Sequence, residues 1–357
     1  MKRGPLALAL FAVAAVAAVA WLGLAPVQIS PQAWSPLPDP MGVGPFQSNG
    51  KLGKLSRLPL DAAQGPEDLY IDPDGTITTG VVDGRILRLR NGEQTVLAQT
   101  GGRPLGLESD RKGGFWVADA RQGLLRVSRK GQVAVVATGH DGQPFGFADD
   151  VDVGPDGTVY MTDADRRWGI DDLKSALLEG APNGALYAVD PTSGQTTALV
   201  EGLHFANGVA VGPEGRYLIV VETLRLRVLK VWLTAERRGQ TEIVLENLPG
   251  FPDNVTSAGG GVFWVALYGP RSALKDRAMS TPWLRQVAAR IPGAGLTRTR
   301  RHGMAVAFNH LGQVLHFLDD PGGAYAPVTT LQEHGGSLYL GSLSEDAIGR
   351  VTAPIRR

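Results

Sequence analysis

Residues 147–161 read FADDVDVGPDGTVYM and combine an apolar strand pattern, a turn that ends in glycine, and a second apolar strand. Glycine supplies the positive φ that such a hairpin turn requires, so this stretch predicts two paired β-strands. Five further turns of the same kind lie between apolar runs, at residues 72–75, 111–114, 212–215, 259–261 and 334–336. The chain therefore repeats one strand–turn–strand unit six times.

The spacing of these turns indicates the type of repeat. From Gly75 to Gly336 the turn glycines are about 52 residues apart on average, near the length of a propeller blade with several strands. No apolar pattern with a period of 3.6 residues runs through the units, which argues against helical repeats. Six units can close into a ring that leaves no exposed sheet edge. We therefore predict an all-β fold, a six-bladed β-propeller over residues 51–357.

Composition narrows the possible functions. The chain has 357 residues, of which 43% are hydrophobic, 47 are glycine and 24 are proline, so it is too apolar to be a disordered chain. It contains no cysteine, which excludes disulfide scaffolds, thiolate metal sites and cysteine nucleophiles. The 35 basic and 35 acidic residues balance, so a nucleic-acid partner is not expected.

The first 25 residues have the pattern of a signal-anchor or a signal peptide. Lys2 and Arg3 precede an uncharged apolar run over residues 6–25, which as a helix is long enough to span a bilayer. Gly23-Leu24-Ala25 also resembles a cleavage site, so an uncleaved anchor and a cleaved signal are both open. The basic residues before the run place everything after it outside the cytoplasm, either membrane-anchored or secreted (periplasmic). Residues 26–50 carry six prolines and are expected to be an extended linker.

Two long intervals between turns predict insertions near residues 164–183 and 271–301, each with a short helix. Residues 271–301 hold eight Lys or Arg residues and one acid, Asp276. They can form a solvated loop, a lid over the mouth of the ring, or a contact with anionic lipid.

Aligning the repeats identifies a candidate metal site. Eight residues before the turn glycine stand Glu67, Asp149, Asn207 and Asp253, whereas the other two repeats have residues near Leu105–Gly106 and Val328. Equivalent positions of different blades surround one axis, so the four oxygen donors are expected to converge there. Three carboxylates and an amide suit Ca²⁺ rather than zinc. Taken singly, each residue can also be a turn residue that bonds the backbone.

These motifs resemble the strictosidine synthase-like family, in its branch of adipocyte plasma membrane-associated proteins within the gluconolactonase and paraoxonase superfamily. The resemblance covers about residues 50–350 and rests on four stretches: GPEDL (65–69), FADDV (147–151), HFANGV (204–209) and PDNV (252–255). It implies a six-bladed propeller with a central Ca²⁺. It also implies that Glu67, Asp149, Asn207 and Asp253 match the metal ligands of the hydrolytic members, which typically have asparagine in place of Asp149.

The sequence also departs from the true strictosidine synthases of this family, which use a glutamate to condense an amine with an aldehyde. Thr329 stands at the position that matches this glutamate. Because a threonine does not act as an acid–base group near neutral pH, strictosidine synthase activity itself is not expected.

The resulting functional prediction is Ca²⁺-dependent hydrolysis of an ester or lactone, as in an arylesterase or lactonase, with a metal-activated water attacking the carbonyl. Candidates for the proton acceptor are Asp253, Asp150 and His204, although His204 also fits a structural strand residue. No Gly-x-Ser-x-Gly motif is present, which argues against a serine hydrolase. The alternative is a non-enzymatic, membrane-anchored propeller that binds a partner or ligand and holds structural Ca²⁺.

The same sequence indicates what kind of pocket to expect. Candidate aromatic walls are Trp168, Trp264, Tyr268 and Trp283, which favour a small-molecule substrate with a hydrophobic acyl or aryl group. The sequence does not indicate an oligomeric state.

Overall fold

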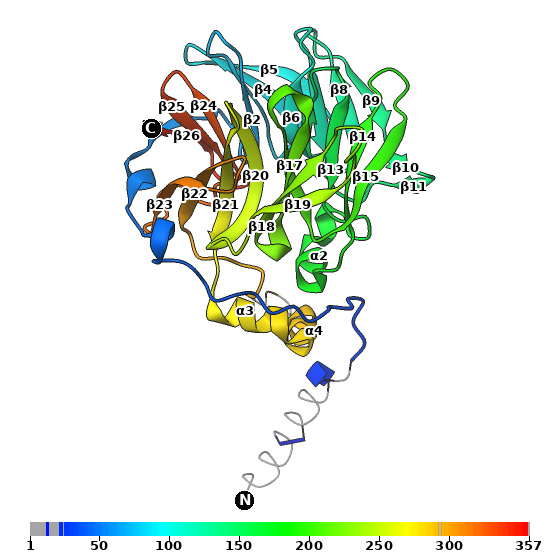
Figure 1. The fold of residues 1–357 in the computed structure, drawn as a ribbon, viewed down its shortest axis with the longest axis vertical. Coiled ribbons are helices and arrows are strands. Elements are labelled where there is room, and N and C mark those ends of the chain that lie inside the picture. The colour runs from blue at the N-terminus through cyan, green and yellow to red at the C-terminus, as the bar shows by residue number, and fades with distance from the viewer. Residues whose placement is uncertain (1–11, 14–20, 24, 292, 294, 356–357) are drawn as a thin grey trace, which may run out of the picture.

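The fold is an all-β ring of six sheets (Figure 1). The computed structural model describes residues 12–13, 21–23, 25–291, 293 and 295–355. Within these residues the strands form six four-stranded antiparallel sheets and one two-stranded hairpin. The first strand of each sheet contacts the first strand of the next sheet all the way around the ring. This arrangement confirms the predicted six-bladed propeller.

The blades follow one another along the chain. The first two comprise β2 (Leu69–Ile71), β3 (Ile77–Gly80), β4 (Arg85–Arg90), β5 (Glu93–Gln99), β6 (Pro104–Ser109), β7 (Phe115–Asp119), β8 (Gly123–Val127) and β9 (Val133–Ala137). The third and fourth comprise β12 (Ala148–Val153), β13 (Val159–Asp163), β14 (Gly184–Val189), β15 (Thr196–Leu203), β16 (Ala206–Val211), β17 (Tyr217–Glu222), β18 (Arg227–Trp232) and β19 (Thr241–Leu245). The fifth and sixth comprise β20 (Gly250–Gly259), β21 (Val262–Pro270), β22 (Gly303–Asn309), β23 (Val314–Asp320), β24 (Thr330–His334), β25 (Ser337–Gly341), β26 (Ala347–Thr352) and β1 (Ser56–Pro59). The separate hairpin pairs β10 (Gly139–His140) with β11 (Gln143–Pro144).

The repeated turns lie where the pattern predicted, each between the first and second strands of a blade. The turn glycines take the left-handed backbone that the hairpins need, with a φ of 84° at Gly75 and 87° at Gly157. An L-residue with a side chain is strained in this region.

The ring closes through its N-terminal strand. β1 pairs antiparallel with β26, from Ser56 opposite Arg350 to Pro59 opposite Ala347. The sixth blade is therefore built from both ends of the propeller sequence. The repeat count predicted a closed ring but did not reveal this pairing, because β1 lies before the first repeated turn.

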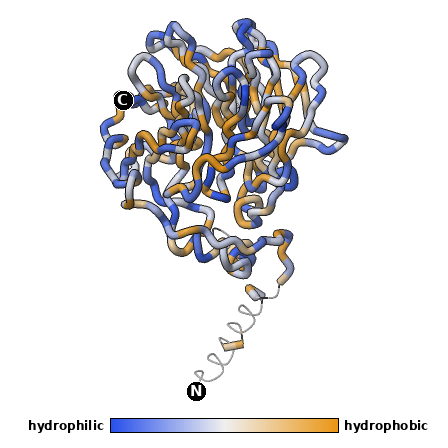
Figure 2. Tube along the Cα trace, in the orientation of Figure 1, coloured by the Kyte–Doolittle hydropathy of each residue, from blue (hydrophilic) through white to orange (hydrophobic). Residues whose placement is uncertain are grey.

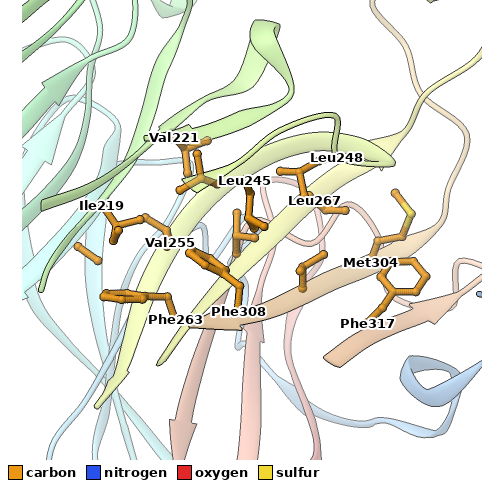
Figure 3. Packing of buried hydrophobic residues seen from close by; sticks show 14 of the residues in the cluster. Ile219, Val221, Leu245, Leu248, Val255, Phe263, Leu267, Met304, Phe308 and Phe317 are labelled. Carbon is orange, nitrogen blue, oxygen red and sulfur yellow. The ribbon is translucent and has the colours of Figure 1, made fainter. Parts of the chain in front are cut away.

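Apolar side chains fill the spaces between blades. In Figure 3 the largest cluster joins the fourth and fifth blades, with Ile219 and Val221 of β17 near Phe263 of β21 and Phe308 of β22. Figure 2 shows apolar segments alternating with polar ones through the ring. Inner strands such as β7 and β13 are thus buried on both faces, which explains their apolar runs, whereas outer strands such as β5 are largely exposed.

Three helices lie together at one end of the propeller (Figure 1): α2 (Leu173–Glu179), α3 (Ala273–Ser280) and α4 (Pro282–Arg290). α4 packs against both α2 and α3. Short 3-10 turns also occur, η1 (Gly44–Phe46), η2 (Lys51–Lys54), η3 (Ile170–Asp172), η4 (Pro213–Gly215) and η5 (Thr223–Arg225). The two insertions thus contain short helices, as expected, and we call α2, α3 and α4 the lid.

Residues 26–50, the predicted extended linker, form a strap along the lid (Figure 1). Trp34 N donates to Met279 O at the end of α3 (3.0 Å), and Arg271 donates to Leu37 O (2.6 Å). Arg290 of α4 donates to Ala25 O (2.8 Å). Bonds to Met279 and Arg271 therefore tie the strap to the lid and to the residues just before it, and Arg290 holds the residue that precedes the strap.

The predicted anchor or signal at residues 1–25 lies mostly outside the described residues. In the portion of the chain that the structure describes, no helix has both the length and the apolar character needed to cross a membrane.

Candidate functional site

A pocket of about 410 Å³ lies between the mouth of the ring and the lid. Glu67, Asp149, Asn207 and Asp253, the four candidate metal ligands, all line it. They come from four places in the ring: Glu67 precedes β2, Asp149 lies on β12, Asn207 on β16 and Asp253 on β20. The structure therefore brings the four sequence-predicted donors into one pocket.

Bulges at the starts of the inner strands position three of these donors. The register of β12 shifts between Ala148 and Val151, and the same shift occurs in β16 and β20 at the corresponding residues. A bulge inserts an extra residue and re-aims the side chains beside it, and such bulges are common next to active sites. Asp149, Asn207 and Asp253 each lie within one of these shifts.

Three of the four donors carry a buried oxygen without a partner. Within the described residues, no hydrogen-bond donor reaches Glu67 Oε2, Asp149 Oδ2 or Asn207 Oδ1. The other Glu67 oxygen accepts a hydrogen bond from Asn254 Nδ2 (2.8 Å). A buried polar atom left unpaired costs about 1–3 kcal/mol, so three in one pocket point to a missing cationic or hydrogen-bonding ligand.

The electrostatics of the pocket also reflect crowding of like charges. Burial, followed by the charges of Asp253 and Asp149, raises the pKa of Glu67 well above its ordinary value. Burial and the charge of Asp253 raise the pKa of Asp149 in the same way. Burial raises the pKa of Asp253 to about 7, although a hydrogen bond from Asn207 opposes the shift. A bound cation would relieve all three shifts.

The donors are hard oxygens, the type that Ca²⁺ prefers. Among the residues that the structure describes, no three Asp, Glu, His or Cys side chains are grouped closely enough to hold a metal ion. The three carboxylates therefore line one pocket but do not by themselves surround one point as a complete set of metal ligands.

Asp150, one of the predicted proton acceptors, does not line the pocket. Its Oδ1 accepts from Val151 N and its Oδ2 from Val209 N of the next blade, both at 2.8 Å. Because both oxygens bond the backbone, Asp150 links the third and fourth blades. Successive side chains of a strand point to opposite faces, so Asp150 points away from the pocket that Asp149 lines.

His204, the other predicted acceptor outside the donor set, also lies away from the pocket lining. Its Nδ1 donates to Gly180 O (2.9 Å) and its Nε2 accepts from Arg225 (2.8 Å). Burial lowers the pKa of His204. Both ring nitrogens are therefore engaged in holding α2 and η5 together, and Asp253 is the predicted acceptor that the structure keeps in the pocket.

The apolar wall of the pocket includes three phenylalanines that the sequence analysis missed: Phe147, Phe205 and Phe251. Each stands two residues before Asp149, Asn207 or Asp253. The repeated pattern of phenylalanine, one residue, and an oxygen donor was the available signal. Phe205 also has a φ of 61°, an uncommon left-handed backbone for an aromatic residue, of the kind found at functional sites.

Of the four aromatic residues that the sequence predicted as pocket walls, one lines the pocket and three do not. Tyr268 lines the pocket. Trp168 is buried with its Nε1 donating to Glu179 (2.6 Å), Trp264 packs between blades, and Trp283 is 55% exposed. Thr329, at the position of the strictosidine synthase glutamate, is fully buried and donates to Glu67 O (2.6 Å).

Comparisons with known proteins identify relatives over most of the chain. The model of the strictosidine synthase family matches residues 149–236, and that of the strictosidine synthase-like N-terminal family matches residues 44–89. Protein strictosidine synthase-like 10 of Arabidopsis thaliana is 32% identical, over 81% of this chain and 86% of its own length. The human adipocyte plasma membrane-associated protein is 29% identical, over 91% of this chain and 84% of its own length.

Solved structures share the fold. A gluconolactonase from Xanthomonas campestris superposes with a TM-score of 0.62 at 15% identity, over 92% of this chain and 99% of that one. A calcium-binding protein, regucalcin, from Agrobacterium tumefaciens superposes with a TM-score of 0.58 at 17% identity, over 83% of this chain and 92% of that one. At these identities the likeness shows a common propeller fold.

Proposed function

The chain belongs to the strictosidine synthase-like family, and from that premise we propose that it is a Ca²⁺-dependent hydrolase of esters or lactones. The observation that carries the proposal is the set of buried, unpartnered oxygens on Glu67, Asp149 and Asn207 in one pocket. The names of two proteins that share the fold, a gluconolactonase and a calcium-binding protein, support the same reading.

Glu67, Asp149, Asn207 and Asp253 are the residues proposed to hold the ion. When bound, Ca²⁺ supplies a positive charge that polarises the substrate carbonyl and lowers the pKa of water. The formal charge of −3 on the three carboxylates favours a divalent cation. The Asn207 amide, which bonds Asp253, orients that carboxylate.

Asp253 is the proposed proton acceptor. Its carboxylate lines the pocket with the other donors, so a carboxylate oxygen that does not bind the ion can take the proton of a water molecule there. In the proposed reaction water attacks the carbonyl carbon and Asp253 takes the water proton. The bond from carbon to the alcohol oxygen then breaks, and Asp253 returns the proton to that oxygen. The products are an acid and an alcohol, or a hydroxy acid from a lactone.

The proposed substrate has an apolar part next to the carbonyl. Phe147, Phe205 and Phe251 stand beside the donors, and leucines of the lid such as Leu173 and Leu177 face the same pocket. These walls exclude water and bind acyl or aryl groups by burial of apolar surface.

We also propose that the protein acts at a membrane, with its propeller outside the cytoplasm and residues 1–25 as anchor or signal. The human relative is named for association with the plasma membrane, which supports a membrane location. The two basic residues ahead of the apolar run support this orientation.

The test is hydrolysis of aryl acetates and of a lactone panel by the full chain, with Ca²⁺, with a chelator, and after Ca²⁺ is restored. We expect turnover that the chelator abolishes and Ca²⁺ restores. Asn207→Ala and Asp253→Asn should each reduce kcat/KM at least ~100-fold, the scale of losing a metal-site or general-base group. Glu236→Ala, at an exposed residue far from the donors in sequence, is the matched control and should keep wild-type turnover.

The outcomes separate the two function classes. Turnover that the chelator does not change contradicts the proposed site. Wild-type rates in both site variants contradict it as well. A Ca²⁺-dependent rise in Tm with no turnover on either panel would instead identify a non-enzymatic propeller with structural Ca²⁺.

A further inference from the structure

The pocket has acidic and basic residues on opposite sides. All three acids that line it come from the ring, whereas Lys174, Lys275, Arg285 and Arg298 come from the lid or the loop after α4. Apolar side chains of the ring and of the lid line the same pocket. The lid side therefore presents positive charge to whatever fills the pocket.

Lys275 forms no ion pair with any residue that the structure describes. Its Nζ lies 4.8 Å from the centre of the Phe251 ring, a cation–π contact. The backbone N of Lys275 donates to Ser272 Oγ, whereas no described residue accepts a hydrogen bond from its Nζ. The adjacent Asp276 is already bound by Arg271 at 3.0 and 3.2 Å. Burial lowers the pKa of Lys275 to about 8, so it is still mostly protonated at neutral pH.

Arg285 is a second uncompensated cation, and it is only 6% exposed. It donates to backbone carbonyls, including Glu179 O (3.0 Å) and Met279 O (3.3 Å), and within the described residues its Nε has no partner. No described carboxylate pairs with it. A buried charge without a counterion is costly, so a ligand that brings an anion would stabilise this arrangement.

We propose that the pocket takes amphiphilic esters or lactones that carry an oxyanion, a carboxylate, sulfate or phosphate, at the end away from the carbonyl. This inference rests on the proposed function for the identity of the reacting group. The carbonyl end lies at the four ring donors, the apolar part lies against the phenylalanines, and the oxyanion binds Lys275 beside Arg285 under the lid.

The test measures binding without turnover. Octane-1-sulfonate and octan-1-ol share one chain and differ in charge, and each is titrated calorimetrically into the Ca²⁺-loaded full chain. We expect the sulfonate to bind about tenfold more tightly than the alcohol, the scale of one hydrogen bond to a charged group. Lys275→Met should abolish this preference and leave the affinity for the alcohol unchanged, which also shows that the variant is folded.

Two further variants complete the test. Lys275→Arg keeps the charge and should keep the preference, and Lys130→Met, at an exposed lysine away from the lid, should behave as wild type. Equal affinity of the wild type for both ligands would overturn the proposal. So would a preference that Lys275→Met retains, because the sulfonate would then bind at the ring donors.

The experiments can contradict the hydrolase proposal and the oxyanion proposal independently of each other. Aryl acetates lack the distal oxyanion and are assayed on the same preparations. A sulfonate preference without turnover contradicts the hydrolase, whereas turnover without a preference contradicts the lid site alone.

Discussion

Asp149 is one of the three carboxylates among the four candidate metal ligands. Its Oδ2 is buried and has no partner among the described residues, and its pKa is raised by burial and by the charge of Asp253. An asparagine at this position would keep an oxygen donor while removing one buried charge. The aspartate therefore costs stability when no cation is bound and strengthens attraction to a divalent cation when one is.

Asp149→Asn should separate these two effects. We expect a higher Tm than wild type in chelator, equivalent to about 1–2 kcal/mol, and a smaller rise in Tm when Ca²⁺ is added. Thermal denaturation across a Ca²⁺ titration measures both quantities. Asp61→Asn, at an exposed residue with no side-chain bond, is the control; an unchanged Ca²⁺ response in Asp149→Asn would remove Asp149 from the ligand set.

The strap is the element that joins the N-terminal region to the ring. At its far end Asp319 of β23 accepts hydrogen bonds from Ser48 Oγ (2.6 Å), Asn49 N (2.7 Å) and Gly50 N (2.9 Å), and it also bonds His302. At its near end it lies on the lid. Because one strap touches both β23 and the lid, loosening it is expected to affect the ring and the pocket roof together.

Asp319→Asn should loosen the strap in a pH-dependent way. Burial alone would raise the pKa of Asp319, but the hydrogen bonds from Asn49, Ser48, Gly50 and His302 outweigh it and lower the pKa below 3.8. A carboxylate with a lowered pKa stabilises the fold fully above its ordinary pKa and loses that contribution as the pH falls below it.

The expected loss for Asp319→Asn is about 1–3 kcal/mol at pH 7. The measurement is Tm from pH 7 down to pH 3. The difference in Tm between wild type and Asp319→Asn should stay constant above about pH 5 and shrink below pH 3.8. Glu236→Gln, at an exposed site, controls for general charge effects. A gap that widens on acidification would contradict this account.

At the scale of the whole molecule, stability depends on how the ring is closed. The sixth blade has its outer strand, β1, from the N-terminal side and its other three strands from the C-terminal end. Without β1, the edge of β26 is exposed and available for pairing with other chains. Closure therefore converts six separate sheets into one cooperative unit.

Removing residues 1–60 should open the ring, whereas removing residues 1–24 should not. We expect the longer truncation to lower Tm by more than 10 °C or to aggregate, because an entire edge of the sixth blade loses its hydrogen bonds, each worth about 0.5–1.5 kcal/mol. Differential scanning calorimetry with light scattering checks this. Equal Tm values for the two truncations would show that β1 is dispensable.

Local chemistry determined what could be predicted from the sequence. The hairpin turns need glycine at set positions, so their spacing alone revealed six blades. The same spacing aligned Glu67, Asp149, Asn207 and Asp253, because a repeated turn keeps each donor at one distance from it. Both results depend on contacts between residues close in the chain.

The tertiary structure decided the features that depend on distant residues. β1 closes the ring by pairing with β26, and the strap meets the lid across more than 200 residues of sequence. Asp150 and His204 were both candidate acceptors from their residue types, yet hydrogen bonds with Val209 N and Gly180 O engage them away from the pocket lining. Side-chain direction at a bulged strand start and burial under a lid follow from the packing of neighbouring blades, which a local pattern does not encode.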